Sequence, residues 1–273
     1  AVGVRLADGG LVRAEKAVLS NATPFHTFME LLPGYDATNP DPRLAAGENP
    51  LPRDFAAHIR HSDYSCGAFK INLALRGLPN FACWPNPPDG RPGPQHHGTI
   101  HFETEMQELE DAYREASLGM PATRPVVEMT IPSALDSTLA PEGHHVCQLF
   151  VQFAPYHVDP KVGSWDDPAF KEAFVQRVYG VVERFAPGFR DLIIGQDAVS
   201  PLDLERILGM HDGNFHHGAL GLHQLAYARP APGYASHRTP LQGLYLCGAG
   251  AHPGGGVMGA AGRNCAKVVL ASV

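Results

Sequence analysis

The chain has 273 residues and a formal net charge of -7, with 44% hydrophobic and 18% charged residues. This composition is typical of a folded globular protein and argues against a disordered or fibrous one. The 21 basic residues form no long run among the 28 acidic ones, so we expect no nucleic-acid partner and no attachment to anionic lipid. The length predicts two lobes. The sequence starts in mid-pattern without methionine, and we expect it to be a piece of a longer protein.

Membrane and cysteine patterns give no positive signal. No stretch approaches the roughly 18 apolar residues that span a bilayer, so we expect no transmembrane segment. No charged-then-apolar leader opens the sequence, which favours a soluble intracellular protein. Five cysteines occur at scattered spacings without a C-x-x-C pair. We therefore expect reduced, buried thiols, with neither a disulfide framework nor a zinc knuckle.

The first 60 residues contain short elements. Alternating valines and leucines around Asp8-Gly9-Gly10 predict a β-hairpin over residues 2–12. A short buried strand is predicted at 17–19, and Thr23-Pro24 favours the start of a helix over 25–32. Residues 35–52, rich in Pro, Asn and Asp, are predicted to form a surface connection. The chain is expected to cross to its second lobe near residue 60.

The middle of the chain contains two kinds of pattern. Residues 67–77, 125–133 and 145–155 alternate apolar and polar side chains, which predicts strands with one buried face. Helices are predicted at 103–118 and at 169–186, where apolar residues recur at helical spacing. Because strands and helices do not alternate regularly, we expect a mixed sheet with helices on one side. The remaining residues, to about 238, are expected to form loops and turns.

The C-terminal region is rich in glycine. Residues 243–248 predict a short strand, seven glycines fall within 248–262, and residues 257–273 are helical in character. A strand, a glycine loop and a helix bring unpaired N–H groups and the positive helix end toward an anionic or electron-rich ligand. Residues 254–259 (GGGVMG) match G-x-G-x-x-G, but a dinucleotide fingerprint must open a βαβ unit and the sequence ends first. These residues are instead expected to end a nucleotide fold, with packing glycines as the alternative.

Two segments resemble a known family. GLYLCGAGAHPGGGVMGAAGRNCA (243–266) closely resembles the C-terminal flavin segment of phytoene desaturase-like FAD-dependent oxidoreductases, and AVLSNATP (17–24) is similar to the segment by which those enzymes return to the nucleotide domain. The resemblance extends over nearly the whole chain and implies a C-terminal half of such an enzyme. It implies FAD as cofactor. The cofactor-binding residues that it implies are Gly248, Ala249, Gly250, Gly255, Gly256, Val257, Met258, Asn21 and Ala22.

Histidines are the other candidate functional residues. His252, inside the glycine loop, either faces substrate or holds the loop. His216 and His217 either line a substrate cavity or occupy ordinary surface or core positions. The histidine doublets lack an acidic or cysteine partner at motif spacing, so we expect no metal site. No residue is assigned a catalytic role, because the sequence contains no triad and no carboxylate pair.

The predicted fold is an α/β flavoprotein that lacks its N-terminal βαβ unit. Residues 1–60 and 236–273 are expected to form parts of an FAD-binding domain, and 61–235 a substrate domain. The resemblance implies an FAD-dependent oxidoreductase that is inactive as this fragment, acting on an apolar small molecule and completed by an N-terminal half. Resemblance to one member of the family further implies a location in the mitochondrial matrix, a role in mitochondrial function and a cytochrome c oxidase subunit as partner. If the protein is bacterial, we expect it to be cytoplasmic. A non-catalytic interaction module and an amine oxidase-like flavoenzyme remain open.

Overall fold

The computed structural model describes residues 1–32, 51–65 and 67–272, which form two compact units. Unit 1 comprises Ala1–Ser65 and Glu205–Val273, and unit 2 comprises Cys66–Leu204. The α/β class agrees with the sequence. The chain was predicted to pass between the two units near residues 60 and 235, and it does so between residues 65 and 66 and between residues 204 and 205. The expected surface connection at 35–52 falls mostly outside the described residues.

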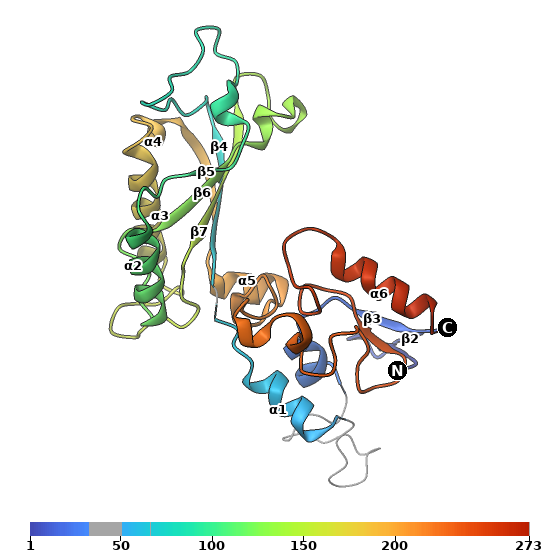
Figure 1. The fold of residues 1–273 in the computed structure, drawn as a ribbon. Coiled ribbons are helices and arrows are strands. Elements are labelled where there is room, and N and C mark those ends of the chain that lie inside the picture. Colours follow the sequence, from blue (N-terminus) through green and yellow to red (C-terminus); the bar gives the residue numbers. More distant parts are fainter. Residues whose placement is uncertain (33–50, 66, 273) are drawn as a thin grey trace. The chain divides into compact units, whose positions relative to one another are not determined.

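Unit 2 is built on one five-stranded sheet with the order β5-β6-β7-β4-β8. Its strands are β4 (Phe69–Leu75), β5 (Ile100–His101), β6 (Val126–Thr130), β7 (His145–Gln152) and β8 (Ile193–Val199). Every neighbouring pair is antiparallel, so the expectation of a mixed sheet is wrong. The helices α2 (Met106–Ser117), α3 (Pro168–Glu183) and α4 (Phe189–Leu192) lie on one side of the sheet, as predicted (Figure 1).

The core of unit 2 follows from the alternation seen in the sequence. Ile71 on β4 and Leu149 on β7 are paired in register, and both are completely buried. Their face of the sheet packs against α3, where Phe174, Val178 and Val182 are 0–1% exposed. Successive strand side chains point to opposite faces, so one register places the apolar set inside.

Unit 1 contains two small sheets. The hairpin β1 (Gly3–Arg5) and β2 (Leu11–Arg13) is antiparallel, and β3 (Val18–Ser20) pairs in parallel with β9 (Leu244–Leu246). A helical turn that includes His26–Glu30 follows β3, and the Thr23 hydroxyl accepts the N–H of His26 at 3.2 Å. The other helices are α1 (Arg53–His61), the boundary helix α5 (Pro201–Leu208) and α6 (Ala260–Leu270). The core of unit 1 includes Phe28, Phe55, Ile59, Leu244 and Leu246.

Five of the labelled elements were not predicted from the sequence: α1, β5, α4, β8 and α5. Of the four cysteines in the described part of the chain, Cys147 and Cys265 are buried as predicted, whereas Cys247 is half-buried and Cys83 is exposed. None of the described helices combines the length and the apolar character that a bilayer crossing requires.

Removing a core side chain from unit 2 should destabilise that unit. Leu149→Ala leaves a cavity beneath α3 and should lower the free energy of unfolding by about 2–5 kcal/mol. Both tryptophans of the sequence, Trp84 and Trp165, lie in unit 2. Trp165 packs on Phe69 and Phe174, so its fluorescence during denaturant unfolding reports this unit.

The control is Leu135→Ala, because Leu135 is 70% exposed in the same unit. It should change the free energy of unfolding by less than about 0.5 kcal/mol. Equal losses for the two variants would contradict the assignment of the core.

Candidate functional site

The site is built at the carboxyl ends of β3 and β9. These strands run parallel with Ser20 opposite Leu246, and the Cys247 N–H donates to the Ser20 carbonyl oxygen at 2.9 Å. Asn21 and Gly248 therefore leave the sheet side by side. In open α/β sheets, ligands bind outside the carboxyl ends of the strands. The structure thus brings together the two segments that the sequence selected, 21–22 and the glycine loop, which we define as residues 248–259.

Protein packing explains two of the glycines. A Cβ on Gly248 would lie 2.4 Å from the Asn21 carbonyl oxygen, and one on Gly250 would lie 2.3 Å from Cδ of Pro24. Real Cβ atoms essentially never come so close. At these two positions the need for glycine therefore follows from contact with the segment after β3 and requires no ligand.

The second half of the glycine loop is open. Gly256, Val257, Met258 and Gly259 are exposed, and Val257, fully exposed, has a left-handed φ of 55°. Such a conformation costs a β-branched residue about 1–3 kcal/mol. Gly259 caps α6 without a side-chain hydrogen bond, and the first turn of α6 holds no acidic residue. No side chain of the described residues therefore accepts a hydrogen bond from the first N–H groups of α6, which suits an anionic or electron-rich ligand.

The candidate histidines lie against the same loop. The Nδ1 atom of His216 would be 2.7 Å from a Cβ on Gly255, and Cβ of His217 would be 3.4 Å from one on Gly250. Within the described residues, the buried Nδ1 atoms of His217 and His252 have no hydrogen-bond partner. Since buried polar atoms are nearly always paired, these two nitrogens point to a water or ligand partner.

Burial and a neighbouring positive charge favour the neutral form of the His216 and His217 imidazoles. Burial, and then the charge of Arg229 and the neighbouring His216, lower the pKa of His217 to about 4. Burial and Arg229 also lower the pKa of His216. A neutral imidazole offers one donor and one acceptor nitrogen to a ligand.

Buried polar side chains behind the loop were missed at the sequence level. Asn214 is completely buried and donates to the Tyr64 carbonyl oxygen at 2.8 Å. Gln224 donates to the carbonyl oxygens of Asp63 and Ala219. Arg229 is 2% exposed. A small cavity lies beside them, and its lining residues include Pro24, Tyr64, His217, Arg229 and Gly250.

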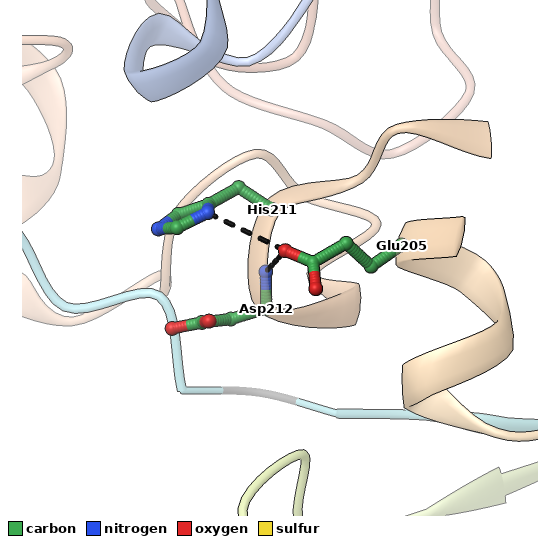
Figure 2. Close-up of side chains that lie close together, drawn as sticks. All are labelled: Glu205, His211 and Asp212. Atoms are coloured by element: carbon green, nitrogen blue, oxygen red, sulfur yellow. Dashed lines mark hydrogen bonds and ion pairs between the residues drawn. The ribbon is translucent and has the colours of Figure 1, made fainter. Parts of the chain in front are cut away.

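Glu205, His211 and Asp212 form a second cluster, which no sequence motif indicated (Figure 2). Their potential ligand atoms lie within 4.8 Å of one another. Oε1 of Glu205 accepts the Asp212 N–H at 3.0 Å and lies 3.5 Å from Nδ1 of His211. The His211 ring stacks on Phe25 with a centroid distance of 3.6 Å. These contacts hold together the turn that follows α5, which explains why the three side chains lie close to one another.

Comparisons with known proteins define the class of protein. No family model matches the chain. It is 28% identical over 261 residues to the lycopene-forming phytoene desaturase of Pseudescherichia vulneris, covering 94% of this chain and 44% of that protein. An oxidoreductase structure from Methanosarcina mazei superimposes with a TM-score of 0.51 at 17% identity, covering 99% of this chain and 45% of the other, and shows a shared fold. The relatives support an FAD-dependent oxidoreductase family, in agreement with the predicted resemblance.

The particular relative is pyridine nucleotide-disulfide oxidoreductase domain-containing protein 2. The chain is 45% identical over 270 residues to the protein of Rattus norvegicus, and 44% identical over 272 residues to that of Mus musculus. The match covers 98% of this chain and 43% of the rat protein. The chain therefore corresponds to the C-terminal half of this relative and spans less than half of its length.

Adding a methyl group at Gly248 should disrupt the site. In Gly248→Ala the new Cβ meets a backbone oxygen that cannot turn away, and we expect unit 1 to lose about 3 kcal/mol of stability. Hydrogen exchange of the β9 amides measures this loss, because unit 1 contains no tryptophan.

The matched control is Gly259→Ala, whose Cβ would meet nothing within 4 Å but whose φ is 67°. Its cost should be about 1 kcal/mol, which is the conformational penalty alone. A Gly248→Ala protein as well protected as the control would contradict the packing of the two segments.

His217 should make unit 1 sensitive to acid. Its folded pKa of about 4 lies below the ordinary value of 6.5, so the unfolded chain binds this proton first. The stability that His217 contributes is complete above pH 6.5 and is lost as the pH falls toward 4. NMR titration of the imidazole C–H signals should show His217 neutral at pH 5, and His217→Asn should reduce the pH slope of stability by about one proton over that window. Titration of His217 near 6.5 would show that it is not buried as described.

Proposed function

We propose that this chain is the C-terminal part of an FAD-dependent oxidoreductase, in which unit 1 supplies one wall of the flavin site and unit 2 the substrate unit. The observation that carries the proposal is the convergence of the β3 and β9 carboxyl ends with the glycine loop. The oxidoreductase relatives support the same class, and the activity belongs to the longer protein.

The described residues fit a flavin at this position. Within the described residues, the N–H groups in the first turn of α6 have no side-chain partner, and the orphaned Nδ1 atoms lie beside the loop at His217 and inside it at His252. Gly255, Gly256, Val257 and Met258 would meet the pyrimidine edge of the isoalloxazine, and Gly248, Ala249 and Gly250 the ribityl and pyrophosphate portion. Asn21 and Ala22 would border the same portion. The flavin supplies hydride and electron transfer, while the protein supplies binding, orientation and electrostatics.

The edge of β3 that faces away from β9 could pair with a further strand. The Val18 N–H donates to the Gly243 carbonyl oxygen, and the Ser20 carbonyl accepts from Cys247, so the backbone of Leu19 faces away from β9. The other edge of β9 is occupied, because Leu246 donates to the His237 carbonyl oxygen at 3.0 Å. Parallel sheets occur almost only in larger, covered arrangements. We propose that the part of the relatives that this chain does not span adds its strands at β3.

The substrate is proposed to be an apolar small molecule, since one relative is named for its action on phytoene. Location in the mitochondrial matrix, a role in mitochondrial function and contact with a cytochrome c oxidase subunit also remain proposals. The main alternative is a non-catalytic interaction module without flavin, which the open β3 edge would equally serve. A measurement of bound flavin distinguishes the oxidoreductase from the interaction module.

An FAD titration tests the proposal. Visible absorbance and flavin fluorescence are followed as FAD is added to this chain, and again after the N-terminal part of the rat relative is supplied. We expect saturable binding only in the second titration, because the nucleotide end of FAD needs the residues that this chain lacks. Failure to bind in both titrations would overturn the oxidoreductase proposal in favour of the interaction module.

The β3 edge supplies the control for this titration. Leu19→Pro removes the outward N–H and leaves the bonds to β9 intact, so it should weaken assembly with the added part at least tenfold. Leu19→Ala keeps that N–H and should assemble more tightly than the proline variant. Assembly of the proline variant at the strength of the unmodified chain would place the partner elsewhere.

A further inference from the structure

Arg229 is a buried cation whose hydrogen bonds, within the part of the chain that the structure describes, all go to backbone carbonyl groups. Its Nε and Nη2 atoms donate to the Ala249 carbonyl oxygen at 3.1 and 3.0 Å. Further hydrogen bonds reach carbonyl oxygens of the preceding segment, at His216, Gly218, Ala219 and Gln224. Among the described residues, no carboxylate forms an ion pair with Arg229.

These hydrogen bonds hold the glycine loop through its own backbone. The carbonyl that receives two guanidinium hydrogen bonds belongs to the middle residue of the Gly248-Ala249-Gly250 turn. The side chain also packs at the start of the second half of the loop, since a Cβ on Gly254 would lie 3.5 Å from its Nε. Gly254 has a φ of 112°, a left-handed conformation that directs the chain toward the exposed residues 256–259. Arg229 therefore ties the loop to the segment that carries His216 and His217.

Burying a cation without an anionic partner is expensive. Removing a charge from water costs several kcal/mol, and buried arginines are normally paired. Carbonyl dipoles offset part of this cost but leave the net charge in place. The charge is felt by the neighbouring side chains, because Arg229 contributes to the lowered pKa values of both His216 and His217.

We propose that Arg229 is the positioning residue of the flavin site: it fixes the glycine loop for FAD and supplies the buried positive charge that stabilises the reduced flavin. This inference rests on the proposed function of the loop. Two-electron reduction leaves negative charge on the flavin, and a fixed cation nearby stabilises that charge and raises the midpoint potential. A neutral side chain of similar size would serve if packing were the only need.

The test uses the chain assembled with the N-terminal part of the rat relative, in four forms: unmodified, Arg229→Gln, Arg229→Lys and Arg238→Gln. Arg238 is an exposed arginine of unit 1 and serves as the matched control. FAD affinity and the two-electron midpoint potential are measured for each. We expect Arg229→Gln to weaken FAD binding at least tenfold. It should also lower the potential by about 30 mV or more, which corresponds to a tenfold loss of preference for the reduced flavin.

Arg229→Lys separates position from charge. Lysine keeps the charge but cannot reach both sides of the loop, so the potential should stay near the unmodified value while FAD affinity falls. The Arg238→Gln protein should match the unmodified one in both measurements. If circular dichroism shows that the glutamine variant is unfolded, the lysine variant decides: unchanged FAD affinity would overturn the positioning role.

Other outcomes are equally decisive. An unmodified assembly without FAD would sink the proposed function itself, whereas FAD bound with unchanged affinity and potential in Arg229→Gln would overturn only the inference about Arg229. Equal losses of affinity in the lysine and glutamine variants, with the potential of both unchanged, would show that Arg229 acts through packing and not through its charge.

Discussion

The parallel pairing of β3 with β9 is the contact on which unit 1 depends. It joins residues more than 220 positions apart in the sequence, and its register places Asn21 beside Gly248. The glycine loop follows β9 and the Thr23 turn follows β3, and His216 and His217 lie against the glycine loop. Because the pair buries Leu244 and Leu246 in the core, the same contact provides stability and site geometry.

The site also divides its tasks among residue types. Glycines at 248 and 250 allow two backbone segments to touch, whereas the glycines at 256 and 259 lie in the open part of the loop. Buried amides at Asn214 and Gln224 hold the histidine segment by hydrogen bonds to main-chain groups. A closely packed inner half and an exposed outer half suit the proposed cofactor site, since affinity depends on preorganisation.

Much of this architecture could be predicted because its signals are local. The strands at 69–75 and 145–152 are indicated by the alternation of apolar and polar residues, and the burial of their side chains alternates in the same way. The helix α5 was missed although its signal was present: Ser200 and Asp203 form a reciprocal cap, with the Ser200 N–H donating to Asp203 at 2.8 Å and the Asp203 N–H donating to Ser200 at 3.2 Å. Strand direction in unit 2 could not be predicted, because it depends on how loops cross the sheet. The burial and role of Arg229 could not be predicted from the sequence, because they depend on hydrogen bonds to carbonyl groups of segments distant in the chain.

The hairpin β1–β2 has a consequence of its own. Its side chains are exposed on both faces, including Val4, Leu11 and Val12 at 46–53%. A two-stranded ribbon without a covered face is marginal in water. The hairpin should open far more often than the strands of unit 2, and among the described strands its backbone should be the most accessible to a protease or to the sheet edge of another molecule. Proteolysis or self-association of the isolated chain should therefore involve its first thirteen residues.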